Sequence, residues 1–264
     1  KPNHSYSIPA VLNGYALAPG VLHLDRLFTK NDITNALRQL HNRKSAKPNG
    51  IPNELWKVIL MNQELQEAMQ NFMNACFLQA RVPELWEIGE IVAIFKKHDP
   101  KKPENYRPIT LLDTMYKIYT RLIANRLNNA VGPYLRKSQY GFRNRRSTTH
   151  AMHVVRRTIE AFFHKTDTDL NLLLMDWSKA FDRVDTDALT DALIAFGIPA
   201  GGQFLKAIQS TFTSKFRVLG RRDDPASSLY PQEVGIRQGC PLSPLLFVIM
   251  LTWLMAGVDL QYAA

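Results

Sequence analysis

The pattern of hydrophobic and polar positions along the chain predicts a mostly helical protein with a few short strands. Hydrophobic residues recur every three or four positions, as amphipathic helices require, in residues 27–40, 54–60, 65–79, 113–127, 148–163, 189–196 and 202–212. Thr29 and Asp113 stand at the start of two of these segments and can accept hydrogen bonds from the first backbone N–H groups. Lys117, Arg121 and Arg126 are expected mostly outside the core-facing side of the helix that follows Asp113.

Four stretches have the composition of strands. Residues 88–95 form one candidate, and residues 215–219 and 229–236 are predicted to pair as a hairpin around the turn RRDDPASS. The apolar run from Leu172 to Met175 has polar residues on both sides, which is typical of a strand buried on both faces. Together with the helices, these strands predict an α/β fold with residues 172–175 at its centre.

Asp176 is the first charged residue after the predicted central strand. A carboxylate at the end of a stiff strand can face a cleft and bind a metal ion there. Phe181 places an aromatic ring near the same cleft, and Asp182 and Asp185 add acidic side chains. The alternative is that Asp176 is only a turn residue or a helix cap, as Asp185 is expected to be for the next helix.

Charge is unevenly distributed along the 264 residues, whose formal net charge is +10. Residues 96–160 contain fifteen Lys and Arg but only four Asp and Glu, whereas residues 161–264 contain nine and eleven. A polyanion-binding surface beside a carboxylate site is the arrangement expected for metal-assisted phosphate chemistry on nucleic acid. A solvated basic face explains the charge equally well, so charge by itself leaves both interpretations open.

The remaining composition is that of an ordinary globular chain, with 45% hydrophobic residues. Cys76 and Cys240 are its only cysteines and are too far apart for a zinc motif, so a reduced, intracellular protein is expected. The longest apolar run, residues 245–258, contains Thr252 and is short for a bilayer span. A core helix is therefore predicted there, and no membrane partner.

Two stretches could contact phosphates and bases. Lys96 and Lys97 follow a predicted strand, and with Arg107 across a loop they could hold a triphosphate, although taken singly each such residue is more often a solvated charge. The stretch 138–147, SQYGFRNRRS, alternates aromatic rings with arginines, which suits backbone contacts and base stacking in a nucleic acid. Its candidate side chains are Tyr140, Phe142, Arg143, Arg145 and Arg146.

The stretch 235–247, GIRQGCPLSPLLF, leads from the predicted hairpin into the core helix. Gly239 permits a close backbone approach, Gln238 offers an amide, Ser243 can cap the helix, and Pro244 fits its first turn. A hairpin-to-helix joint explains the glycine, serine and proline. It does not explain why an amide beside a glycine should lie opposite the acidic segment.

The order of these motifs resembles the reverse transcriptase domain of non-LTR (LINE-type) retrotransposons and, more loosely, group II intron reverse transcriptases. The resemblance extends over about residues 27–256 and rests on the stretches NYRPITLL, QYGFR, DWSKAFDRV and GIRQGCPLSPLLF. It implies a right-hand polymerase fold with helix-rich fingers and an antiparallel palm sheet. On this basis residues 27–165 would form the fingers with part of the palm, residues 166–264 the palm, and residues 1–26 a linker or fragment edge.

The resemblance also implies roles for individual residues. Asp176 would be a catalytic, metal-binding aspartate with the backbone carbonyl of Trp177 beside it, and Phe181 would be the steric gate against a ribose 2′-hydroxyl. The residues expected on the incoming nucleotide are Lys96, Lys97, Arg107, Phe181, Gln238 and Gly239. Those expected on the template or primer are Tyr140, Phe142, Arg143, Arg145 and Arg146.

The implied activity is RNA-directed DNA synthesis, in which two Mg²⁺ ions activate a primer 3′-hydroxyl for attack on a deoxynucleoside triphosphate. An RNA template, a DNA primer and deoxynucleoside triphosphates are the implied partners, and nuclear residence follows from the family only. Two alternatives remain open, a non-catalytic RNA-binding domain and a structural scaffold derived from a reverse transcriptase.

Three departures from the family pattern affect these expectations. Asn49 stands where Asp is usual, and His150 stands where an acidic residue is common. The family's other two catalytic aspartates, in an aromatic-Ala-Asp-Asp turn, and its thumb have no counterpart before the final QYAA. The palm is therefore expected to be incomplete, and the chain by itself is expected to be inactive.

Overall fold

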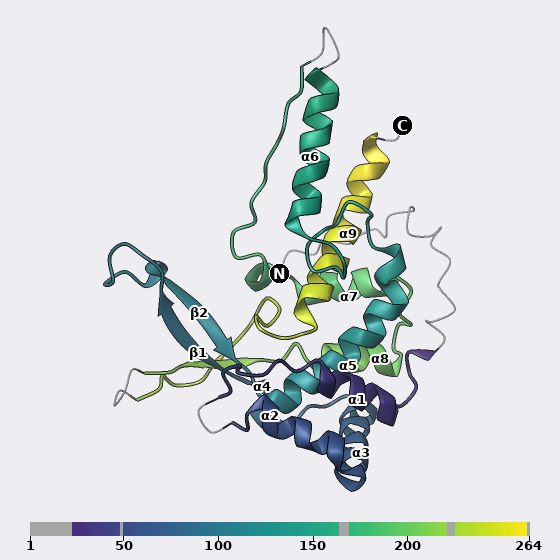
Figure 1. Ribbon diagram of the computed structural model, residues 1–264, viewed down its shortest axis with the longest axis vertical. Coiled ribbons are helices and arrows are strands. Elements are labelled where there is room, and N and C mark those ends of the chain that lie inside the picture. Colours follow the sequence, from purple (N-terminus) through teal and green to yellow (C-terminus); the bar gives the residue numbers. More distant parts are fainter. Residues whose placement is uncertain (1–22, 48–49, 164–168, 221–224, 263–264) are drawn as a thin grey trace.

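The computed structural model describes residues 23–47, 50–163, 169–220 and 225–262, which form a helical body with a small projecting sheet (Figure 1). The predicted linker lies almost wholly outside these residues, as do Asn49 and part of the turn RRDDPASS. The α-helices are α1 (Lys30–Arg38), α2 (Asn53–Trp56), α3 (Gln63–Gln79), α4 (Glu84–Glu87), α5 (Thr114–Val131), α6 (Thr148–Phe163), α7 (Thr186–Ala195), α8 (Gln203–Gln209) and α9 (Ser243–Tyr262). Short 3₁₀ helices are η3 (Lys57–Met61), η4 (Pro103–Asn105), η5 (Gly132–Tyr134) and η6 (Phe181–Arg183).

Local capping explains where the predicted helices begin. Thr29 and Asp32 form a reciprocal capping box at the start of α1, in which each side chain accepts from the other residue's backbone N–H. The Asp113 carboxylate accepts from the N–H of Met115 at 2.8 Å at the start of α5. Asp185 accepts from two backbone N–H groups, both at 2.9 Å, at the start of α7. The predicted caps Thr29, Asp113 and Asp185 are confirmed.

The core is built around α5, which lies between the α1–α3 pair and the α7–α9 layer (Figure 1). Aromatic and aliphatic side chains fill it, and the largest of them that are fully buried include Phe28, Phe77, Tyr116, Tyr119 and Phe204. The segment predicted as a core helix is confirmed, because α9 buries Leu246, Val248 and Ile249. No helix within the described ranges is both long and apolar enough to cross a membrane.

Arg126 differs from the expectation that it would lie outside the core. Its guanidinium lies 4.2 Å from the centre of the Phe28 ring and donates to the backbone carbonyls of Leu24 at 2.8 Å and Leu27 at 3.4 Å. An arginine can be buried when carbonyl oxygens accept its N–H groups and an aromatic ring covers its face. The prediction was wrong here because these partners come from the segment before α1, about a hundred residues away in sequence.

A four-stranded sheet with the order β2-β1-β3-β4 projects from the helical body (Figure 1). Its strands are β1 (Ile88–Phe95), β2 (Tyr106–Leu111), β3 (Lys215–Val218) and β4 (Tyr230–Pro231). β1 pairs antiparallel with β2 and parallel with β3, and β3 pairs antiparallel with β4. The predicted first strand is confirmed. The predicted hairpin pairing is also confirmed, but its second strand covers only Tyr230–Pro231 and not residues 229–236. β2 was not predicted, because its Arg107-Pro108 step is typical of a loop.

The predicted central strand is absent. Leu172 to Met175 belong to an irregular segment that runs past α6 (Figure 1), and Leu174 is 90% exposed. A strand forms only when another strand accepts and donates its backbone hydrogen bonds. Among the described residues no strand pairs with this segment, so its hydrophobic composition did not suffice and the prediction was wrong.

Candidate functional site

Two motifs that are more than fifty residues apart in sequence meet at the base of the sheet. The N–H of Gly235 donates to Val184 O, and the N–H of Ile236 donates to Phe181 O, both at 2.9 Å. Gly235 has φ +97°, and a Cβ atom on it would lie 2.8 Å from the backbone of Asp182. Only glycine permits this approach, so Gly235 is what allows the loop before α9 to lie against η6.

Gln238 and Asp182 face each other across this junction. The Gln238 side-chain amide donates to Asp182 Oδ1 at 3.2 Å, and both residues are exposed. Gly239 has φ +84°, and a Cβ atom on it would lie 3.2 Å from Thr110 O in β2. The loop 235–240 thus lies against η6 on one side and against the sheet on the other.

A cavity of about 330 Å³ opens beside the Gln238–Asp182 pair. It is lined by Ile91, Pro108, Thr110, Asp182, Phe216, Tyr230, Gln232, Val234 and Gln238. The sequence predicts Gln238 at such a site, whereas it predicts Asp182 only as a source of local negative charge. Its position directly after Phe181 in DWSKAFDRV was the available signal.

Phe181 is half-buried among other phenylalanines. Its ring stacks on Phe247 of α9, with centroids 5.2 Å apart and planes at 20°. Phe142 from the loop 138–147 approaches edge-on, with centroids 6.0 Å apart and planes at 89°. The structure therefore brings Phe181, the predicted steric gate, into contact with Phe142 of the loop 138–147, which is predicted to bind nucleic acid.

The antiparallel β1–β2 pair brings the predicted triphosphate contacts to one end of the hairpin. Arg107 lies opposite Ile94, and the N–H of Lys96 donates to Asn105 O at 2.8 Å just beyond. Side chains alternate between the two faces of a strand, so Lys96 and Arg107 share one face. Pro108, which lines the cavity, lies on the other face. Lys96, Lys97 and Arg107 are all exposed, and none of them lines the cavity.

The three arginines of the loop 138–147 are not equivalent. Arg143 donates to Gly132 O at 2.9 Å and Arg136 O at 2.8 Å, which are backbone acceptors at and after the end of α5. Burial, with a further contribution from the nearby Arg146 charge, lowers the pKa of Arg143. Its hydrogen bonds show that Arg143 holds the shape of the loop.

Arg146 also bonds to other residues of this part of the chain, whereas Arg145 does not. Arg146 donates to Gln139 O at 3.1 Å and to Lys137 O, and its guanidinium lies 5.5 Å from the centre of the Tyr140 ring. Arg145 is exposed and has no hydrogen-bonding or ionic partner in the described part of the chain. Of the three, Arg145 is the one whose guanidinium is available to another molecule.

Asp176 lies in the irregular segment rather than at the end of a strand. It is exposed, and the neighbouring Trp177 is 56% exposed. The described residues contain no group of three or more His, Cys, Asp or Glu side chains that could hold a metal ion. The described residues therefore do not bring together the several carboxylates that two Mg²⁺ ions require.

Comparison with known proteins agrees with this arrangement of motifs. Residues 95–263 match the family described as reverse transcriptase (RNA-dependent DNA polymerase). The probable RNA-directed DNA polymerase from transposon BS of Drosophila melanogaster is 30% identical over 223 residues, which cover 83% of this chain and 24% of that protein. The RNA-directed DNA polymerase from mobile element jockey of the same species is 29% identical over 225 residues, 84% of this chain and 24% of that protein.

A third relative extends the likeness to another insect. The retrovirus-related Pol polyprotein from type-1 retrotransposable element R2 of Popillia japonica is 29% identical over 193 residues, 72% of this chain and 26% of that protein. The chain thus spans about a quarter of the length of these relatives. Because the family match covers more than half of the chain and its relatives are non-LTR retrotransposon polymerases, the chain belongs to the reverse transcriptase (RNA-dependent DNA polymerase) family.

Proposed function

We propose that this chain is the part of a retrotransposon RNA-directed DNA polymerase that binds the RNA template, the DNA primer and the incoming deoxynucleoside triphosphate. The observation that carries the proposal is the junction of the loop 235–240 with η6, which presents Gln238 and Asp182 at one cavity beside the sheet. The reaction served is transfer of a nucleotide to a primer 3′-hydroxyl.

Each predicted residue keeps a role in this proposal. Gln238 and Gly239 contact the nucleotide, and Phe181 rejects a ribose 2′-hydroxyl by its volume. Lys96, Lys97 and Arg107, at the end of the β1–β2 hairpin, bind the triphosphate. Tyr140, Phe142 and Arg145 contact the template or primer, while Arg143 and Arg146 support the loop that carries them.

The metal site forms a separate part of the proposal. Asp176, with the backbone carbonyl of Trp177, would contribute one carboxylate to the Mg²⁺ ions that such polymerases use for phosphoryl transfer. Among the described residues no group of three or more His, Cys, Asp or Glu side chains gathers around it. We therefore propose that the chain by itself does not extend a primer, with Mg²⁺ or with Mn²⁺.

The test uses ternary-complex formation, which does not require catalysis. The chain is mixed in Mg²⁺ buffer with an RNA template annealed to a DNA primer, and dissociation of the complex is measured with each of the four deoxynucleoside triphosphates. The proposed function predicts that only the nucleotide complementary to the template base slows dissociation. Stabilisation by all four nucleotides alike, or by none, would overturn it.

The same experiment separates the two alternatives. An RNA-binding domain without a nucleotide site would bind the primer–template but would not respond to any nucleotide. A scaffold would bind neither. Asp176→Asn serves as the control for the metal-binding assignment, because it should weaken the response to the complementary nucleotide and leave binding of the primer–template unchanged.

An intracellular, nuclear location is proposed from the family likeness only, since retrotransposon synthesis at a chromosomal target takes place there. Imaging of the longer native protein in its own cells tests this proposal. Exclusion of the protein from the nucleus would contradict it.

A further inference from the structure

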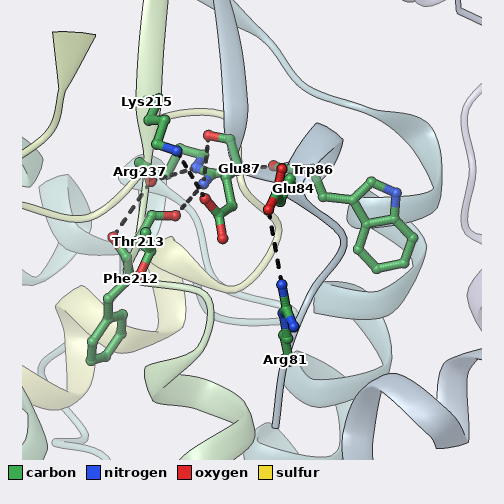
Figure 2. A network of polar contacts seen from close by, with 9 residues as sticks. Arg81, Glu84, Trp86, Glu87, Phe212, Thr213, Lys215 and Arg237 are labelled. Atoms are coloured by element: carbon green, nitrogen blue, oxygen red, sulfur yellow. Dashed lines mark hydrogen bonds and ion pairs between the residues drawn. The ribbon is translucent and has the colours of Figure 1, made fainter. Parts of the chain in front are cut away.

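Arg237 is adjacent in sequence to Gln238, but its side chain points the opposite way. Gln238 is exposed, whereas Arg237 is only 3% exposed. Figure 2 shows its guanidinium among the backbone of Trp86 and Glu87 on one side and of Thr213 on the other. A charged side chain is buried this deeply only when hydrogen bonds replace its water.

The hydrogen bonds of Arg237 use four of the five N–H groups of its guanidinium. One terminal nitrogen donates to Trp86 O at 2.6 Å, and the other donates to Glu87 O at 3.1 Å and Thr213 O at 2.8 Å. Nε donates to Ser214 Oγ at 2.8 Å. The described residues offer Arg237 no carboxylate partner, since the Glu87 side chain pairs instead with Lys215 at 3.8 Å.

These acceptors stand at the starts of two neighbouring strands. Trp86 and Glu87 lead into β1, and Thr213 and Ser214 lead into β3, with which β1 pairs in parallel. The guanidinium fork therefore fixes the loop 235–240 relative to the beginning of the sheet. A lysine has three donors on a single atom and cannot reach acceptors arranged in this fork.

Tyr116 contacts both Arg237 and the far end of the loop 235–240. The guanidinium of Arg237 lies 4.5 Å from the centre of the Tyr116 ring, and the Tyr116 hydroxyl donates to Cys240 Sγ at 3.5 Å. Ile236 and Cys240 are buried on either side of the exposed pair Gln238 and Gly239. The loop is thus held from beneath, and its exposed residues are Gln238, which lines the cavity, and the neighbouring Gly239.

We infer that Arg237 is a positioning residue for the incoming nucleotide, which it affects by holding Gln238 at the cavity beside Asp182. This inference rests on the proposed function, because it concerns the nucleotide that the cavity would bind. It assigns Arg237 no contact with the nucleotide, the template or the primer.

The test compares Arg237→Lys with Arg126→Lys. Both arginines are buried, donate to backbone carbonyls and lie over aromatic rings, and both changes keep the positive charge. Arg126 lies between the segment before α1 and α5, away from the loop 235–240. Both variants should lower thermal stability, so stability alone does not decide between a structural and a positioning role.

Two measurements distinguish these roles. The first is amide hydrogen exchange of residues 235–240, which should accelerate in Arg237→Lys and remain unchanged in Arg126→Lys. The second is affinity of the primer–template complex for the complementary deoxynucleoside triphosphate, which should fall on the order of tenfold or more in Arg237→Lys, as misplacement of a binding group predicts. Affinity for the primer–template itself should stay at the wild-type value.

Equal effects of Arg237→Lys and Arg126→Lys in both measurements would overturn the inference. If the wild-type chain does not distinguish the complementary nucleotide, the proposed function fails, and hydrogen exchange then decides whether Arg237 holds the loop. Should Arg237→Lys fail to fold, Ser214→Ala removes only the bond to Nε. Faster exchange of residues 235–240 with a smaller loss of nucleotide affinity is then expected, and unchanged exchange would contradict the inference.

Discussion

Phe181 stands between two other phenylalanines, and this packing limits how far its ring can move. Phe247 covers one face of the ring and Phe142 meets its edge. A ring held in this way can exclude a single additional hydroxyl by volume. Its orientation follows from α9 and from the loop 138–147, neither of which is near it in sequence.

Phe181→Val should therefore reduce discrimination against ribonucleotides. Steric rejection of one added group corresponds to roughly 10–200-fold in selectivity. The measurement is the ratio of affinities for the complementary deoxy- and ribonucleoside triphosphates in complex with the primer–template. Phe247→Leu removes the ring that stacks on Phe181 but keeps the Phe181 side chain, so it should change the ratio less. An unchanged ratio in Phe181→Val would remove this residue from the nucleotide site.

Arg145 provides the second prediction at the scale of single residues. Its guanidinium is free of partners in the described part of the chain, so it can pair with a phosphate. Arg145→Gln should weaken RNA binding and reduce the slope of log affinity against log salt by about one. Arg81→Gln, the same change at an exposed arginine outside residues 96–160, should leave the slope unchanged.

Arg143→Gln should behave differently, because this side chain holds the carbonyls of Gly132 and Arg136. It should lower thermal stability more than Arg145→Gln does. If Arg145→Gln left both affinity and slope at the wild-type values, the solvated-face interpretation of the basic residues would be favoured.

At the scale of elements, the end of α3 contains a strained residue. Ala80 caps this helix in the left-handed conformation, with φ 46° and ψ 40°, and its N–H bonds to the carbonyls of Cys76 and Phe77. The left-handed region costs a residue with a Cβ atom about 1–2 kcal/mol, whereas glycine adopts it without that cost.

Ala80→Gly should therefore stabilise the protein by about 1 kcal/mol, and raise the melting temperature by about 2–4 °C. Urea and thermal unfolding measure both quantities. Ala68→Gly is the matched control, because Ala68 is an exposed residue inside the same helix. Glycine there should destabilise the protein by about 1 kcal/mol. Destabilisation by both changes would show that the helix does not end at Ala80 in solution.

At the scale of the whole molecule, the buried tyrosines of α5 link folding to alkaline pH. Burial raises the pKa of Tyr119, and the Tyr119 hydroxyl has no hydrogen-bond partner among the described residues. In the unfolded chain a tyrosine titrates near pH 10. Because the folded pKa is the higher one, the contribution to stability is complete below about pH 10 and is lost as the pH rises above it.

Tyr119→Phe should accordingly leave stability near neutral pH within about 1 kcal/mol of wild type, since the hydroxyl it removes is unpaired. Above about pH 10 the wild type should lose stability relative to the variant, by up to about 1.4 kcal/mol per pH unit. Urea unfolding between pH 7 and 11 measures this difference. Parallel stability curves over the whole range would show that Tyr119 is not buried as a neutral phenol.

The sequence alone determined the features that depend on neighbouring residues. Helices follow from hydrophobic spacing, and their starts follow from Thr29, Asp113 and Asp185, whose caps close over two or three residues. The order and spacing of four motifs determined the family, which the comparisons confirm. Each of these features is encoded within one short segment, so no knowledge of the tertiary fold was needed.

Only the tertiary structure decided which segments meet. The bond from Gln238 to Asp182 depends on a partner far away in the sequence, and so does the burial of Arg126 and Arg237. The apolar run 172–175 shows the same dependence, since a strand needs a second strand beside it. The chemical type of a side chain limits which groups it can bond to or pack against. Long-range packing decides which of those groups it actually meets, and therefore where the site lies.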